Sequence, residues 1–147
     1  MNIGTLLSKA ARTYPENLAI ARGASEWTYA RFNGRVNQLA NALLRLGIRQ
    51  GDNVALLMFN CPEMLESLFA CFKAGCGAVP INFRLHPKEF AFIVDHSESR
   101  ALIISPEFDA AVAGVRDQIP RVQHVIAVSG GQEGAKDYNA LLSAESE

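Results

Sequence analysis

The chain has 147 residues, of which 49% are hydrophobic, and it carries a net charge of −1 at pH 7. This length suits one domain, or one subdomain of a larger protein, with a sizeable buried core. The 15 acidic and 14 basic residues are interspersed, so the chain offers neither a basic field for nucleic acid nor a polybasic block for a membrane surface.

Neither the N-terminus nor any internal segment predicts export or membrane insertion. Residues 1–9 lack the basic start and apolar core of a secretory signal. No apolar run approaches the ~18 residues that a membrane-spanning helix needs. The three cysteines, Cys61, Cys71 and Cys76, lie on or beside an apolar helix, and their odd number favours reduced thiols over a disulfide framework. We therefore expect a cytoplasmic protein.

The first half of the chain predicts an N-terminal helix, a hairpin and a long helix. Residues 18–21 and 26–29 flank Arg22-Gly23-Ala24-Ser25, which suits an antiparallel hairpin at one edge. The long helix runs from Thr28, which can cap its first turn, to Gly47, which can supply the left-handed residue that ends it. Its apolar residues recur every three or four positions: Phe32, Val36, Leu39, Leu43 and Leu46.

Four short apolar runs, 54–58, 78–81, 101–104 and 124–128, predict strands that are buried on both faces of a parallel sheet. They start 23 or 24 residues apart, as repeated strand-plus-helix units do. One helix is expected at 62–74, with an apolar stripe of Met64, Leu65, Leu68, Phe69 and Phe72. Another begins near Pro87 and carries Phe90, Ile93 and Val94, and a weak one lies near 137–142.

These elements predict an α/β fold. Its sheet is mostly parallel and built from repeated strand-helix units, with helices on both faces and an N-terminal helix plus edge hairpin. The whole of residues 1–147 forms one unit without an internal boundary.

The usual motifs of a catalytic centre or a metal site are absent. The loop Gly130–Gly134 lacks the Lys-Ser/Thr of a phosphate-binding P-loop and the G-x-G-x-x-G spacing, and is typical of a surface turn. His86, His96 and His124 have no cysteine or second histidine at ligand spacing. Cys71 falls within an apolar helix and is expected to be a core thiol. We assign no catalytic residue and no metal ligand.

The segment Asn82–Leu85 is the one local motif with functional content. It follows a predicted parallel strand, at the edge where open α/β sheets bind their ligands. Arg84 brings a permanent cation with a planar donor fork that suits a phosphate. The alternative is a surface arginine that pairs with Glu89 or braces the loop, while Asn82 hydrogen-bonds its own turn.

The order of these pieces resembles the N-terminal part of the adenylate-forming superfamily, which includes acyl- and aryl-CoA ligases. The resemblance rests on Trp27–Asn33, Asn60–Glu63 and Pro80–Leu85. In related aryl-CoA ligases, the arginine of the matching Asn-x-Arg-Leu contacts a phosphate on the nucleotide part of coenzyme A. The resemblance therefore implies this role for Arg84, and it implies that the chain is part of a larger adenylate-forming domain.

The resemblance also implies ATP, Mg2+ and coenzyme A as cofactors of the full-length enzyme, and a carboxylic acid as its substrate. The family's Ser/Thr-Gly-Thr-Thr-Gly-x-Pro-Lys-Gly phosphate loop, ribose-binding acidic residue and C-terminal lysine have no match in residues 1–147. We expect this chain alone to bind none of the cofactors and to form no acyl-adenylate. Fatty, aromatic and short-chain acids all remain open, as does a homodimer. The alternative is a free-standing, non-catalytic binding or regulatory domain with the inherited fold.

Overall fold

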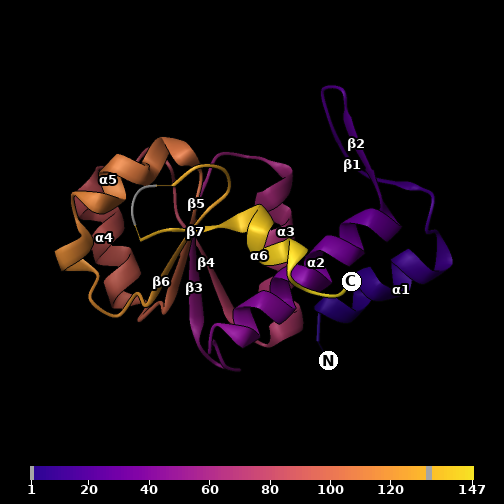
Figure 1. Ribbon diagram of the computed structural model, residues 1–147, viewed down its shortest axis with the longest axis horizontal. Coiled ribbons are helices and arrows are strands. Elements are labelled where there is room, and N and C mark those ends of the chain that lie inside the picture. Colours follow the sequence, from indigo (N-terminus) through magenta and orange to yellow (C-terminus); the bar gives the residue numbers. More distant parts are fainter. Residues whose placement is uncertain (1, 132–133) are drawn as a thin grey trace.

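The computed structural model describes residues 2–131 and 134–147 and has the predicted α/β architecture (Figure 1). The predicted turn Gly130–Gly134 includes Gln132 and Glu133, which lie outside the described residues. The helices are α1 (Gly4–Thr13), α2 (Tyr29–Arg45), α3 (Pro62–Ala74), α4 (Pro87–His96), α5 (Asp109–Ala113) and α6 (Tyr138–Ser143). The strands are β1 (Leu18–Arg22), β2 (Ser25–Thr28), β3 (Asn53–Leu57), β4 (Gly77–Pro80), β5 (Ala101–Ile104), β6 (His124–Ala127) and β7 (Lys136–Asp137).

The main sheet has five parallel strands in the order β4-β3-β5-β6-β7. The four predicted strands are confirmed, with ends displaced by at most one residue. The fifth, β7, was not predicted, because Lys136 and Asp137 have none of the apolar character of a buried strand. Between β5 and β6 the connection is irregular, with short 3-10 turns at Pro106–Phe108 and Arg116–Gln118 on either side of α5.

Helices cover both faces of this sheet, as predicted (Figure 1). Val54 and Leu56 of β3 pack into a core shared with α2, α3 and α6. Ala55 and Leu57, on the opposite face, pack into a second core with α4 and α5. All four side chains are fully buried. Full burial of a leucine stabilises the folded state by roughly 1.5–3 kcal/mol. Because both faces of these strands are buried, their sequences are unbroken apolar runs.

The long helix α2 begins and ends at the residues that the sequence predicts. The hydroxyl of Thr28 accepts a hydrogen bond from the backbone N–H of Arg31 at 3.3 Å. Gly47 has a φ of 92°, and the N–H of Ile48 donates to the carbonyl of Leu43 at 3.1 Å. This is the αL termination that a glycine just past a helix provides.

The predicted hairpin is confirmed, and it forms a separate two-stranded sheet from β1 and β2. It projects from the end of the molecule that carries α1 and α2 (Figure 1). Trp27 and Ile20 anchor its base in the core, whereas most of its other side chains are exposed.

The most buried face of helix α3 is not the apolar stripe that its sequence predicts. Its fully buried residues are Glu66, Ser67, Ala70 and Cys71, while Leu65 is 41% exposed. The small side chains allow α3 to approach the sheet and α2 closely. The larger apolar residues of the predicted stripe are displaced toward α1, β1 and the surface, where they are only partly buried.

Candidate functional site

The loop Asn82–Leu85 lies directly beyond β4, at the carboxyl edge of the parallel sheet. The side-chain oxygen of Asn82 accepts a hydrogen bond from the backbone N–H of Arg84 at 3.0 Å. This is the predicted local turn, and it fixes the backbone from which Arg84 extends. The Arg84 side chain is exposed.

Three phenylalanines from three successive loops meet beside Arg84. Phe59 follows β3, Phe83 follows β4 and Phe108 follows β5. The ring centroid of Phe59 is 4.8 Å from that of Phe83 and 5.2 Å from that of Phe108. The guanidinium carbon of Arg84 lies 5.7 Å from the centre of the Phe83 ring. The sheet therefore gathers an aromatic base next to a cation at the edge where such folds bind ligands.

The expected alternative partner of Arg84 is engaged elsewhere. The carboxylate of Glu89 accepts the backbone N–H of His86 at 2.7 Å and completes a capping box at the start of α4. Within residues 2–131 and 134–147, Arg84 forms no ion pair. Its charge is thus available to an external anion.

The loop Asn60–Glu63 forms the turn between β3 and α3. Glu63 lies in the first turn of α3, where a negative charge complements the helix dipole. Cys61 occupies the N-cap position without a side-chain hydrogen bond. Burial raises the pKa of its thiol to about 11, and the nearby Glu63 contributes. A thiol with such a pKa is a poor nucleophile at neutral pH.

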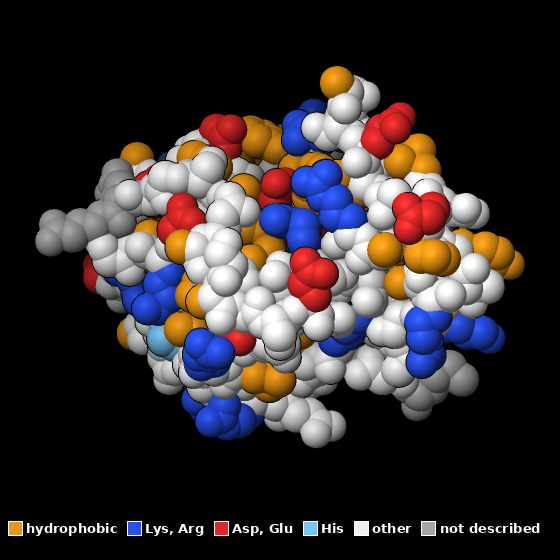
Figure 2. Space-filling view, turned by 45° about the vertical axis from the view of Figure 1, so that its right-hand side comes forward, with side chains coloured by type: hydrophobic (Ala, Val, Ile, Leu, Met, Phe, Trp, Pro, Cys, Tyr) orange, Lys and Arg blue, Asp and Glu red, His pale blue; other side chains and the backbone are white. Residues whose placement is uncertain are grey.

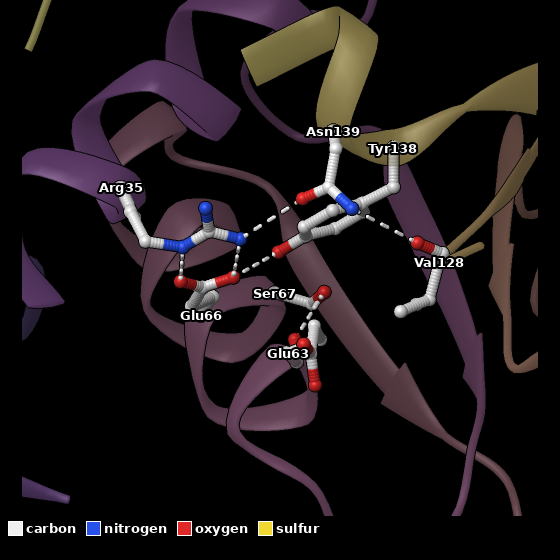
Figure 3. A network of polar contacts seen from close by, with 7 residues as sticks. All are labelled: Arg35, Glu63, Glu66, Ser67, Val128, Tyr138 and Asn139. Atoms are coloured by element: carbon white, nitrogen blue, oxygen red, sulfur yellow. Dashed lines mark hydrogen bonds and ion pairs between the residues drawn. The ribbon is translucent and has the colours of Figure 1, made fainter. Parts of the chain in front are cut away.

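A second polar cluster lies inside the molecule, between α2, α3 and α6 (Figure 3). The Glu66 carboxylate is completely buried and receives two hydrogen bonds from the Arg35 guanidinium and one from the hydroxyl of Tyr138, the last at 2.6 Å. Arg35 also donates to the side-chain oxygen of Asn139 at 3.4 Å, and Asn139 in turn donates to the carbonyl of Val128 at 3.4 Å.

The pKa values in this cluster are shifted in the way that active sites often show. Burial raises the pKa of Glu66, against the hydrogen bonds from Arg35 and Tyr138 that favour the carboxylate. Burial also raises the pKa of Tyr138 well above its usual value, and the Glu66 carboxylate adds to this shift. Both groups, however, are satisfied by one another and by Arg35, so they have no open position for a substrate. We interpret the cluster as a structural link between α2, α3 and α6.

Sequence reasoning missed this cluster because its members come from three distant elements. The one available signal was an acidic residue, Glu66, among the apolar residues of a helix. Such a residue needs a partner if it is buried. Nothing local identifies Arg35, 31 residues earlier, or Tyr138, 72 residues later, as that partner.

The three histidines lie apart and have separate structural contacts. His86 caps α4, His96 stacks on Phe92, and the Nε2 atom of His124 is 2.9 Å from the carbonyl oxygen of Leu46. In the part of the chain that the structure describes, no three His, Cys, Asp or Glu side chains gather as a metal site. No helix among these residues is long and apolar enough to cross a membrane.

Comparison with known proteins identifies the family. Residues 7–146 match the model of the AMP-binding enzyme family. The 3-oxocholest-4-en-26-oate–CoA ligase of Rhodococcus rhodochrous is 32% identical over 99% of this chain, which corresponds to 27% of the relative. A feruloyl-CoA synthase of an Amycolatopsis species is 41% identical over 77% of this chain and 23% of its own length.

The solved structures that resemble this chain are also CoA ligases or synthetases. An anthranilate CoA ligase in complex with anthranoyl-AMP superposes with a TM-score of 0.95 at 29% identity, over 99% of this chain and 28% of the ligase. A Mycobacterium tuberculosis fatty acyl CoA synthetase superposes with a TM-score of 0.88 at 31% identity, again over 99% of this chain and 28% of that protein. The chain thus spans roughly a quarter of the length of these relatives, at their N-terminal end. Its matched segment and its fold together show that it belongs to the AMP-binding enzyme family, as an N-terminal portion of an adenylate-forming acyl-CoA ligase.

Proposed function

We propose that this chain is the N-terminal part of an ATP-dependent ligase that joins a carboxylic acid to coenzyme A through an acyl-adenylate. The family match over residues 7–146 is the observation that carries this proposal. ATP and Mg2+ would serve the adenylation step, and coenzyme A would accept the acyl group. The names of the two sequence relatives refer to acids as different as a ferulate and a steroid acid, so the acid that this ligase activates is not identified by them.

Within such a ligase, this segment would supply one wall of the large domain and a contact to coenzyme A. Arg84 is exposed, unpaired within the described residues and seated against Phe83. A guanidinium held in this way needs little reordering before it binds a phosphate oxygen. The phosphate on the nucleotide part of coenzyme A is the proposed partner.

The nucleotide contact can be tested by comparing coenzyme A with dephospho-coenzyme A, which lacks the 3′-phosphate. In the full-length ligase, Arg84→Gln should remove the preference for coenzyme A over the dephospho form in a calorimetric or NMR titration. Arg31→Gln is a matched control, because Arg31 is also exposed and also lies over an aromatic ring, 5.0 Å from the centre of Trp27. Equal affinity of the unsubstituted full-length ligase for the two ligands would refute the phosphate contact.

The chain alone is proposed to be inactive in adenylation. Adenylyl transfer depends on cations and backbone donors positioned around the phosphates of ATP. Residues 1–147 contain no match to the family's phosphate loop. An assay of acid-dependent ATP–pyrophosphate exchange should therefore give no signal above a heat-treated control. The homodimer and the cytoplasmic location that the sequence suggests stay predictions.

A further inference from the structure

Lys73, in the last turn of α3, is the one lysine of the chain that the fold partly encloses. The four lysines are Lys9, Lys73, Lys88 and Lys136. Lys73 is half-buried, whereas the other three are exposed. On the face that carries α1 and the hairpin, Figure 2 shows the described Lys and Arg side chains at several separate places instead of in one basic patch. What distinguishes Lys73 is therefore its immediate surroundings.

Two asparagines of α2 hold the Lys73 amine. Its Nζ atom lies 2.6 Å from the Oδ1 atom of Asn33 and 2.6 Å from that of Asn37. The two asparagines are four positions apart, so they lie on the same side of α2. Both acceptors are neutral amides, and Lys73 forms no ion pair with the described residues. The nitrogen is thus held in place without the carboxylate that usually accompanies an enclosed ammonium.

Helix α1 restricts the aliphatic stem of Lys73 as well. Gly4, the first residue of α1, lies so close that an added Cβ there would be 2.6 Å from the Cγ atom of Lys73. Ser8, also on α1, donates from its hydroxyl to the Oδ1 atom of Asn33 at 3.4 Å. Residues of three helices therefore surround this side chain and keep its amine beside the asparagines.

This arrangement suits a neutral amine. A neutral amine has two N–H donors and one lone pair, and Asn33 and Asn37 supply two acceptors. Among residues 2–131 and 134–147, the Nζ atom has no third hydrogen-bond partner. Burial lowers the pKa of Lys73, and no charged neighbour contributes to the shift. Both hydrogen bonds can thus be kept while the lone pair occupies the remaining position around the nitrogen.

We propose that Lys73 is an acylation site that takes the acyl group of an activated carboxylic acid. The lone pair of Nζ attacks the acyl carbon, and an amide bond forms. The bond from that carbon to a phosphate oxygen or a thiol sulfur breaks, and the phosphate or thiolate leaves with the bonding pair. One proton of the nitrogen passes to water. A desolvated lysine amine is an established type of nucleophile toward a carbonyl carbon.

This inference rests on the proposed function in one respect, the origin of the donor. A ligase that forms acyl-adenylates and acyl-CoA thioesters produces both classes of activated acyl group. The amide product keeps a single N–H, so it donates to Asn33 or to Asn37 but not to both. It also loses the positive charge that complements the helix dipole in the last turn of α3. Acylation therefore weakens the contact between α3 and α2.

Acylation by an added donor tests the site. The intact protein that contains this chain is treated with acetyl phosphate at about pH 8, and separately with acetyl-CoA, and the acetylated peptides are quantified over time by mass spectrometry. Lys73 should be acetylated faster than Lys9, Lys88 and Lys136. A reaction with acetyl phosphate alone would assign an acyl phosphate anhydride as the donor class, whereas a reaction with acetyl-CoA would assign a thioester.

Asn37→Asp places a carboxylate where the amide oxygen now lies, with almost no change of shape. It stabilises the ammonium form, so acetylation of Lys73 should slow about tenfold or more. Asn41→Asp is the matched control, because Asn41 lies one turn further along α2 and its amide donates to the carbonyl of Ser146, not to Lys73. This variant should leave the rate at Lys73 unchanged within about twofold, since an exposed charge is screened by salt.

Two results would overturn the proposal. One is acetylation of Lys73 that is no faster, with either donor, than that of the three exposed lysines. The other is an equal rate at Lys73 in Asn37→Asp and in the unsubstituted protein. Both donors are added from outside, so the result does not depend on whether the protein activates an acid. A failure here leaves the coenzyme A titration at Arg84 as an independent test of the proposed function.

Discussion

The hydroxyl of Tyr138 donates a 2.6 Å hydrogen bond to the buried carboxylate of Glu66, although the two residues are 72 positions apart. The bond joins α6, near the end of the chain, to α3 in the middle. Arg35 of α2 binds the same carboxylate, so one acidic side chain links three helices (Figure 3). The rigidity of this part of the molecule should depend on that link.

Tyr138→Phe should destabilise the fold by about 1–3 kcal/mol, because the Glu66 carboxylate would lose a donor in a place where water cannot replace it. The ring itself still fits its buried position. Urea unfolding followed by circular dichroism measures the change. Tyr14→Phe provides the control, since Tyr14 is 56% exposed and its substitution should change the free energy of unfolding by less than about 0.5 kcal/mol.

Arg35→Met should cost about 3–5 kcal/mol, because it leaves a buried carboxylate without its charged partner. Adding Glu66→Met to this variant also removes the unpaired buried carboxylate. The double variant should therefore recover a large part of the lost stability. If the double variant were less stable than Arg35→Met alone, the carboxylate could not be the source of the loss.

The stability of the protein should decline at alkaline pH, with Tyr138 as one identifiable cause. The pKa of Tyr138 is raised in the folded state, so the unfolded chain releases this proton first. A group of this kind stabilises the fold below its unfolded pKa of about 10, and this contribution is lost as the pH rises further. The free energy of unfolding between pH 9 and about pH 11 should therefore fall less steeply in Tyr138→Phe than in the unsubstituted protein.

Gly47→Ala should destabilise the protein by about 1–2 kcal/mol, because the φ of 92° at this position disfavours any residue with a Cβ. Gly114→Ala offers a comparison at another helix end. Gly114 has a φ of −69°, and an added Cβ would meet only ordinary van der Waals contacts. That variant should be neutral, or more stable by about 0.4–1 kcal/mol. Thermal unfolding of the two variants gives the comparison.

Cys61 should be the first of the three thiols to react with iodoacetamide, and its alkylation should be slow. It is half-buried, whereas Cys71 and Cys76 are buried. Because the pKa of Cys61 is about 11, the alkylation rate should rise about tenfold for each pH unit from 8 to 10, in proportion to the thiolate. Mass spectrometry of peptides after timed labelling distinguishes the three sites, and a rate that does not change between pH 8 and 9 would contradict this assignment.

The elements that the sequence predicts well are those whose signals act within a few residues. Thr28 caps α2 and Gly47 ends it through hydrogen bonds to backbone groups three to five residues away. Strand β5 was predicted at its observed bounds because both of its faces are buried, so nearly every side chain must be apolar. The loop at Arg84 is predicted well for the same reason, because its turn depends on Asn82, two residues earlier.

The amino-acid sequence by itself determined most of the helices and strands, the parallel α/β class and the position of Arg84 just beyond the end of β4. Only the tertiary structure decided which face of α3 is buried, what Glu66 binds and which three loops bring Phe59, Phe83 and Phe108 together. The physical reason is the range of the interactions. Backbone geometry is set by neighbours along the chain, whereas close packing and the pairing of buried charges select partners from elements that meet only when the chain folds.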